Sequence, residues 1–273
     1  MYFCKLREEK IMNLHRVWGI MMQELYITMH SIETINDIFF IALINFLLFG
    51  FLSTYLLGSQ NSQTGQFLVL GMLLWEIVRI VQYSISVGSL WNIWSRNLSN
   101  LFISPLSILE YLTAHTLSGI VKGLLVFGMA SVAAIIAFHF NIYKIGLLNL
   151  LFIIINLICF SFATGIILLG IIFKFGTRVQ ALTWAIIPIL QPITAVFYPV
   201  HIMPLPLQVF AYIFPTTFVF EAARAILLTH QFQWTLLGIA FVENIIYITI
   251  AIFIFERLFI SAKMTGQFAR NQD

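Results

Sequence analysis

Charged residues are scarce in this sequence. Asp, Glu, Lys and Arg together make up 9% of the 273 residues, whereas apolar residues make up 60%. A soluble globular domain carries about 25% charged residues, because most of its surface faces water. Lipid must therefore be the solvent for much of this surface. We expect a single transmembrane domain over 1–273, with no room for an additional soluble enzyme domain.

Cysteine and the common catalytic motifs are also nearly absent. Cys4 and Cys159 lie far apart, which argues against a disulfide framework, and the six histidines lack zinc-ligand spacing. No G-x-S-x-G or paired intramembrane aspartates indicate an enzyme, and no G-x-x-x-x-G-K-[ST] loop is present to hold ATP phosphates. We expect no catalytic residue, no metal, no cofactor in this chain and no nucleic-acid partner.

The sequence contains several long runs of apolar residues. A helix rises 1.5 Å per residue, so about 20 apolar residues cross a hydrocarbon core of about 30 Å. The fifth of the six predicted spans is the weakest, because Pro188 and Pro192 interrupt it. The predicted spans are 38–57, 67–90, 113–140, 147–173, 182–198 and 234–258.

The distribution of Lys and Arg predicts the orientation, because these residues gather in cytoplasmic loops. Six spans with both termini inside leave only Lys144 and Arg224 in external segments. A seventh span over 205–228 would move three basic residues outside and place Pro215 inside a helix, so we reject it. We expect a multi-pass protein of a prokaryotic cytoplasmic (inner) membrane, without a cleaved signal peptide. The basic residues predicted inside are Lys5, Arg7, Lys10, Arg16, Arg96, Lys174, Arg178, Arg257, Lys263 and Arg270.

Residues 11–36 have the pattern of an amphipathic helix. Their charges are too frequent for a span, and two interpretations stay open. The helix lies in the cytoplasmic membrane interface, or it is a soluble arm packed on a partner. Arg16, Gln23 and Glu24 lie mostly off the apolar stripe. That stripe follows steps of three and four through Ile11, Leu14, Trp18, Met21, Leu25, Met29 and Ile32.

The segment 91–112 is the longest cytoplasmic connection in this topology. Ser104-Pro105 is a helix-start signal, and Ser107 and Glu110 have the spacing of a capping box. We therefore expect a helix to start here and continue into the third span. An apolar face over 98–102 would need a cover, either lipid headgroups or a partner protein.

Proline is concentrated in one region, with six of the seven prolines between Pro188 and Pro215. Proline removes an amide donor and clashes with the preceding turn, so no straight helix can cover 199–230. Two short helices, over 205–214 and 217–228, are predicted instead. Broken backbone at membrane depth must be buried in protein or line a cavity. We therefore predict an external re-entrant helical hairpin before the last span.

Two stretches carry a resemblance to a known family: L-F-I-S-P-L-S-I-L-E-Y, and F-Y-P-V-H-I-M-P-L-P-L-Q with the following F-P-T-T-F-V-F-E-A-A-R. With the six spans and the amphipathic N-terminal helix, they resemble the permease subunits of type 2 ABC exporters for drugs, nodulation factors and polysaccharides. The resemblance implies two copies of this chain, each bound to one ATPase subunit that carries ATP and Mg²⁺. It also implies outward transport of a lipid-linked glycan, a lipid or an amphipathic small molecule.

The resemblance further assigns roles to residues. Those expected to couple to the ATPase are Arg96, Asn97, Leu101, Phe102, Ser104, Pro105 and Glu110. Those expected in the external hairpin are Pro199, Pro204, Pro215, Glu221 and Arg224, where the last two match the family's acidic-then-arginine pattern.

Four charges fall inside predicted spans, where an isolated charge costs about 2.5 kcal/mol or more. They are Glu76, Arg79, Lys122 and Glu243, and they sum to zero. Glu76 and Arg79 share a helical face, and Lys122 could instead snorkel to the interface. They either line a transport path or form a polar lock, or they are a buried network that sets helix packing. As an alternative function, an ion-coupled secondary transporter or channel would use these same charges.

Overall fold

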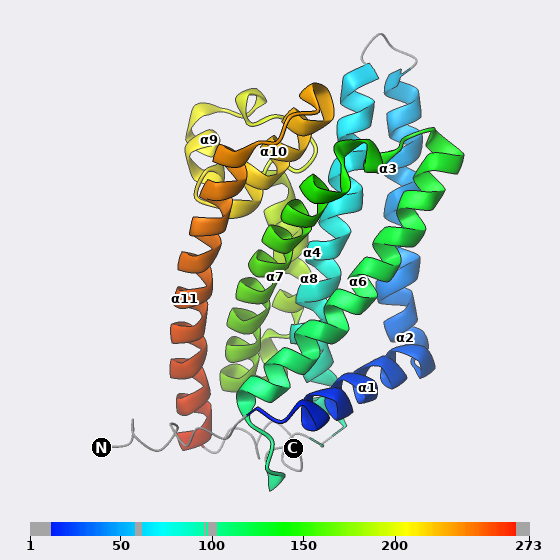
Figure 1. The fold of residues 1–273 in the computed structure, drawn as a ribbon. Helices are drawn as coiled ribbons and strands as arrows, with labels where there is room; N and C mark the ends of the chain where they lie inside the picture. The colour runs from blue at the N-terminus through cyan, green and yellow to red at the C-terminus, as the bar shows by residue number, and fades with distance from the viewer. Residues whose placement is uncertain (1–11, 58–61, 96, 98–102, 266–273) are drawn as a thin grey trace.

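The computed structural model describes residues 12–57, 62–95, 97 and 103–265 (Figure 1). Within these ranges the chain is all-helical and contains no strand. Five helices are long and apolar enough to cross a membrane, and the count becomes six if the bent pair α9–α10 is one span. The predicted all-α class is confirmed, and the apolar helices have the character of a multi-pass membrane protein.

The five long helices overlap five of the predicted spans. Most of them extend beyond the apolar run, because a helix can continue its backbone hydrogen bonds after the chain leaves the hydrocarbon core. Before the first of them, the short α2 (Ile32–Ile35) leads into a π-helical turn, η1 (Asn36–Phe40). The long helices are α3 (Ile41–Leu57), α4 (Ser62–Trp94), α6 (Ile108–Phe138), α7 (Leu147–Phe175) and α11 (Trp234–Met264).

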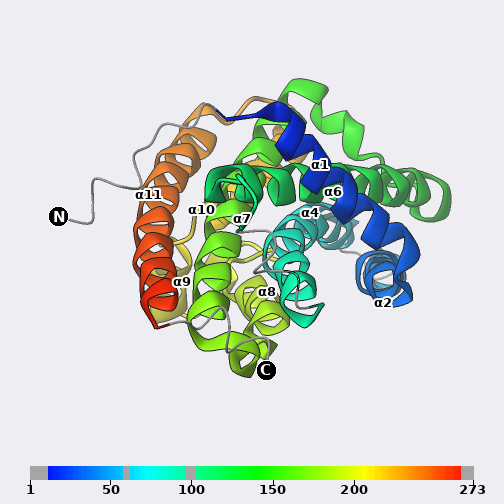
Figure 2. The ribbon, with the colours of Figure 1, turned by 90° about the horizontal axis from the view of Figure 1, so that it is seen from below.

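Helix α4 is the centre of the bundle. In its most apolar window 94% of the residues are buried, whereas the figure is 22% for the corresponding windows of α3 and α11. Helices α3, α6, α7 and the shorter α8 pack around α4, and α11 packs on the outer side of α7 (Figure 2). Because α4 contacts α3, α6, α7, α8 and α10, a polar group on α4 must find its partner inside the protein.

Helix α1 (Leu14–His30) crosses one end of the bundle and packs on α6 (Figures 1 and 2). Its buried residues are Val17, Met21, Glu24 and Thr28. Most of the predicted apolar stripe faces outward instead: Trp18 is 60% exposed. Glu24 lies off this stripe, as predicted, and it is nevertheless buried, because the charged side chain finds partners beneath the helix. The outward apolar residues include Leu14, Trp18, Met29 and Ile32.

The proline-rich region forms short helices. Helix α8 (Ala181–Ile193) is about 20 Å long and falls short of a bilayer core, so the predicted span 182–198 is corrected to this shorter helix. Both prolines, Pro188 and Pro192, lie inside this helix, which ends just before the turn that contains Ala195 in a left-handed conformation. Helices α9 (Leu205–Ala211) and α10 (Pro215–Thr229) follow, bent by 99°. The prediction of two short helices here is confirmed.

The two unusual segments lie at opposite ends of the bundle. Helix α1, the start of α6 and the end of α11 lie at one end, here called the α1 end (Figure 1). The α9–α10 pair and the connection η2 (Ile142–Ile145) between α6 and α7 lie at the other, here called the α10 end. The segments predicted to be interfacial and re-entrant therefore lie at opposite ends of the bundle.

Candidate functional site: three buried ionic clusters

The first cluster, the α4 pair, consists of Glu76 and Arg79. The Arg79 guanidinium donates to Glu76 Oε2 from Nε at 2.7 Å, and its NH2 group lies 2.6 Å from the same oxygen. It also donates to the carbonyls of Asp37 at 2.7 Å and Ile38 at 3.1 Å. Tyr83 donates its hydroxyl to the Asp37 carboxylate. The pair predicted from the i,i+3 spacing forms, and it also joins α4 to η1.

The reason for this arrangement is the π-helical turn. A π-helix bonds i to i+5, so the local carbonyl pattern departs from that of an α-helix. Both main-chain carbonyls that accept hydrogen bonds from Arg79 belong to η1. A guanidinium presents five donors in a fixed planar fork, which suits two carbonyls and one carboxylate at once. Arg79 therefore bridges the irregular start of α3 to the central helix.

The second cluster, the α10 pair, consists of Glu221 and Arg224. Arg224 donates to the carbonyls of Ala195 at 2.9 Å and Val196 at 3.2 Å, and to Glu221 Oε1 at 3.0 Å. The same Glu221 oxygen accepts the amide of Val200 at 2.8 Å. These backbone groups belong to the turn that follows α8. The sequence placed Arg224 in an external segment, and its side chain is buried to 4% exposure.

The turn after α8 is strained and closely packed. Ala195 has a φ of +52°, a left-handed conformation that is uncommon for a residue other than glycine. Gly71 of α4 lies against the same turn, and a Cβ at this position would be 2.4 Å from the Val196 carbonyl oxygen. Arg224 and Gly71 therefore hold one short stretch of backbone from two sides.

The predicted hairpin prolines occupy positions suited to proline. Pro199 precedes η4 (Val200–Ile202), and Pro204 is the N-cap of α9. Pro215 is the first residue of α10, where the missing amide costs no helical hydrogen bond. These residues set the breaks between the short helices that the α10 pair then holds together.

The third cluster, the α1 cluster, was not predicted as a unit. Glu24 of α1 places its Oε2 3.7 Å from Nδ1 of His115 and 3.9 Å from Nζ of Lys122, both on α6. All three side chains are buried. The snorkelling interpretation requires the Lys122 ammonium to reach water. The side chain instead ends beneath α1 and is 5% exposed. Gly88 gives the cluster its room, since a Cβ there would be 2.8 Å from the Glu24 carboxylate.

One feature of the sequence could have indicated the α1 cluster. Val17, Met21, Glu24 and Thr28 follow steps of three and four, which places Glu24 on a continuous helical face. Glu24 was placed off the apolar stripe and was assigned no partner. His115 was considered only as a metal ligand, and its Nδ1 lies 3.1 Å from the Ser84 carbonyl oxygen. The sequence alone does not show which residue of another helix lies beside a buried charge.

Glu243 lies apart from the other three predicted intramembrane charges. It stands on α11, and its Oε2 atom is buried without a hydrogen-bond partner in the described part of the chain. The neighbouring Asn244 instead donates to the main-chain and side-chain oxygens of Asn156 on α7, both at 3.1 Å. The four charges thus do not form one network: Glu76 pairs with Arg79, Lys122 with Glu24, and Glu243 with neither pair.

The segment before α6 contains the residues predicted to couple to an ATPase. The capping box is confirmed: Ser107 is the N-cap, and Glu110 accepts its amide at 2.8 Å. The helix therefore starts after Ser107, and Ser104 and Pro105 lie in the preceding turn. Asn97 donates its amide to the Asn92 carbonyl. Arg96, Leu101 and Phe102 lie outside the described residues.

Glu110 also connects this segment to α1. Its Oε1 accepts the amide of Asn13 at 2.8 Å, and Arg16 lies 3.7 Å from its Oε2. Arg16 donates in addition to the carbonyl of Pro105. Glu110 is fully buried among these partners. The start of α1, the turn at Pro105 and the start of α6 therefore form one connected unit.

The comparisons with known proteins do not assign this chain to a family. No protein-family model matches the chain, and no curated protein matches its sequence. Over the described ranges, no group of three or more His, Cys, Asp or Glu side chains could hold a metal ion. The site is therefore interpreted from its own geometry.

Proposed function

We propose that this chain is the membrane-spanning subunit of an ATP-driven exporter of the type 2 ABC class. It would move a lipid-linked glycan, a lipid or an amphipathic small molecule outward across the cytoplasmic membrane. Energy would come from a separate ATPase subunit, and two copies of the chain would pair. The observation that carries the proposal is the unit at the α1 end, where Glu110 and Arg16 tie α1 to the turn before α6.

This unit has the mechanical connections that coupling requires. A displacement of the turn at Pro105 would act on α1 through Arg16 and on α6 through Glu110. Both helices meet above the buried α1 cluster, against the central helix α4. Near the other end, α4 contacts α10 through Trp75 and Phe220, whose ring centroids are 5.9 Å apart. Packed contacts of this kind are the physical means by which one site can influence another.

The surface of the turn offers a contact for an ATPase. Ile103 precedes the turn and is 83% exposed, and in the proposed orientation it faces the cytoplasm. An exposed large apolar side chain beside a fixed turn is suited to burial in a partner's groove. Ile202, which is 64% exposed at the α10 end, is a matched residue that an ATPase could not reach.

The test is purification of the tagged chain from its native membrane in mild detergent. We expect a stoichiometric partner with a Walker motif, together with ATP hydrolysis that co-elutes with the complex. Ile103→Asp should remove the partner, whereas Ile202→Asp should retain it. Reconstituted complex should then transport a labelled amphiphile only when ATP is supplied. Transport by the chain alone, driven by an ion gradient, would refute the exporter proposal.

Glu243 supports the alternative of an ion-coupled transporter or channel. A carboxylate in the middle of an apolar helix is suited to taking up a proton or cation when one of its oxygens is buried and accepts no hydrogen bond from the described residues. The chain alone in proteoliposomes would then carry a proton- or sodium-driven flux. Glu243→Gln should abolish that flux, and the exporter proposal instead predicts no ATP-independent flux in either protein.

A further inference from the structure

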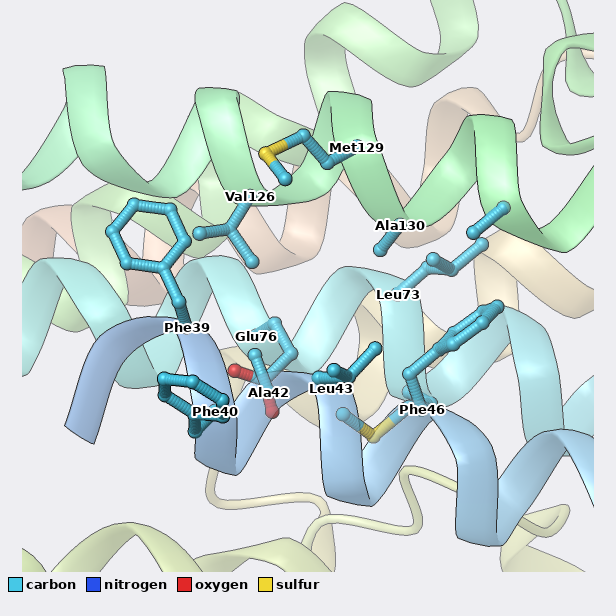
Figure 3. A pocket seen from close by; sticks show the side chains of 12 residues that line it. Phe39, Phe40, Ala42, Leu43, Phe46, Leu73, Glu76, Val126, Met129 and Ala130 are labelled. Atoms are coloured by element: carbon cyan, nitrogen blue, oxygen red, sulfur yellow. The ribbon is translucent and has the colours of Figure 1, made fainter. Parts of the chain in front are cut away.

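A groove of about 290 Å³ lies between α3, α4 and α6 on the flank of a single subunit (Figure 3). Its lining is apolar except for one carboxylate, that of Glu76. Figure 3 shows Phe39 and Phe40 toward one end, Phe46 toward the other, and Glu76 between them. At about 30 Å³ for a water-sized group, the groove holds on the order of ten methylene-sized groups. The remaining lining residues are Ala42, Leu43, Met72, Leu73, Val126, Met129, Ala130 and Ala133.

The position of the groove restricts what can enter it. Three of its lining residues are also exposed on the outer surface: Phe40 at 55%, Leu43 at 49% and Met129 at 60%. They stand on helices that are long and apolar enough to span a membrane. The groove therefore opens toward the acyl chains of the bilayer. Molecules already dissolved in the membrane have access to it, and strongly hydrated molecules do not.

The carboxylate of Glu76 gives the groove a polar contact point. The side chain is 3% exposed, and its Oε2 atom is taken by Arg79. The Oε1 atom has a single hydrogen-bond partner among the described residues, the Asn45 amide at 3.5 Å, which is longer than an ordinary hydrogen bond. A carboxylate oxygen can accept two hydrogen bonds, so Oε1 has capacity for a closer donor.

The charge balance favours an uncharged donor. Arg79 already neutralises Glu76, so a cation in the groove would be attracted by one member of the pair and repelled by the other. A hydroxyl group carries no net charge and loses far less hydration on entering an apolar groove than an ammonium group does. A hydroxyl hydrogen bond to an ionised acceptor is also among the stronger ones in proteins.

We propose that this groove binds one alkyl-chain amphiphile from the membrane, with a hydroxyl head that donates to Glu76 Oε1. Its chain lies along the apolar lining between the Phe39–Phe40 end and Phe46. The proposal does not depend on the exporter function, because the groove belongs to one subunit and needs no ATPase.

The experiment uses the full-length chain in lipid nanodiscs and a tagged long-chain alcohol with a diazirine in its chain. Light-induced labelling should concentrate on the lining residues of α3, α4 and α6. The methyl ether of the same alcohol fits the same space but cannot donate a hydrogen bond. We expect the ether to label these residues about tenfold less at equal concentration, as loss of a hydrogen bond to a charged group predicts.

Matched variants test the location. Ala130→Phe fills the groove, and Ala137→Phe places the same side chain on an exposed, non-lining position of the same helix. We expect Ala130→Phe to lower labelling about tenfold and Ala137→Phe to leave it unchanged. Equal labelling by alcohol and ether would overturn the proposal, as would labels spread evenly over the outer faces of α7 and α11. The alcohol-to-ether comparison in the unaltered protein decides the matter even if Ala130→Phe does not fold.

Discussion

The α4 pair and the α10 pair share a local sequence and differ in what surrounds them. Each has an aromatic residue followed by Glu-x-x-Arg: Trp75 to Arg79 in one, Phe220 to Arg224 in the other. In each, the arginine donates to the carbonyls of two consecutive residues, which lie in the π-helical turn η1 for Arg79 and in the turn after α8 for Arg224. An i,i+3 acid–arginine pair on one helix can therefore hold a neighbouring break in regular structure.

The glutamates of the two pairs differ in the hydrogen bonds that they accept. Glu221 Oε1 accepts hydrogen bonds from both Arg224 and the Val200 amide, so the α10 pair is satisfied within the fold. Glu76 Oε1 has only a distant amide partner and lines a groove. The comparison teaches that one pair closes a turn completely, whereas the other holds a turn and leaves an oxygen for a ligand.

Removing the arginine of the α10 pair should have the largest effect. Arg224→Met leaves two buried carbonyls and the Glu221 charge without their donor, which we expect to cost about 3–5 kcal/mol of stability. The measurement is the thermal denaturation midpoint of the detergent-solubilised protein. Arg224→Lys should recover only part of the loss, because an ammonium cannot reproduce the planar fork. A midpoint unchanged by Arg224→Met would show that the pair does not hold the turn.

The corresponding change in the α4 pair should be less damaging. The Arg79 side chain is 15% exposed compared with 4% for Arg224, so water replaces more of its hydrogen bonds, and Arg79→Met should cost about 2–3 kcal/mol. The glutamate left behind acts in the opposite direction, because the Glu76 side chain is 4% exposed and that of Glu221 is 26% exposed. The same denaturation assay compares the two variants directly. If Arg79→Met proved more damaging than Arg224→Met, the burial of the glutamate left behind would outweigh the burial of the arginine.

Gly71 tests the packing between α4 and the turn held by the α10 pair. Gly71→Ala forces a methyl group against the Val196 carbonyl, and we expect a cost of about 1–3 kcal/mol. Gly128 on α6 is the control, since a Cβ there meets nothing within 4 Å. Gly128→Ala should be neutral or stabilising by about 0.4–1 kcal/mol. Equal effects of the two substitutions would contradict the close approach.

The smallest expected effect concerns the contact between the two motifs. Trp75 and Phe220 precede the two glutamates, and their rings meet with centroids 5.9 Å apart. A double-mutant cycle with Trp75→Leu and Phe220→Leu should give a coupling energy of about 0.5–1.5 kcal/mol. Additive denaturation shifts would mean that the two aromatic residues are energetically independent despite this contact.

Several elements could be predicted because their causes are local. Long apolar runs form spanning helices for lack of any other way to satisfy backbone groups in lipid. The Ser107–Glu110 capping box and the two helices around Pro215 follow from spacing and from the missing amide of proline. The Glu76–Arg79 contact follows from i,i+3 geometry on one helix. Residue order along one helix was sufficient in each case.

Other features depended on segments distant in the sequence. Glu24 is buried because Lys122 and His115 of α6 lie beneath α1. The length of α8 was overestimated, since hydropathy does not register where a helix with two internal prolines stops. No local pattern indicates that Arg79 reaches η1, or that α3, α4 and α6 leave a groove beside Glu76.

The sequence by itself therefore determined the solvent of this protein, its helical class and the positions of its breaks. These follow from composition and from hydrogen bonding within one segment, which neighbouring residues settle among themselves. Only the tertiary structure decided which buried charges meet and which carboxylate lines a groove. A charge in an apolar bundle is stabilised by whichever partner lies within about 4 Å, and that distance is set by the packing of helices far apart in the chain.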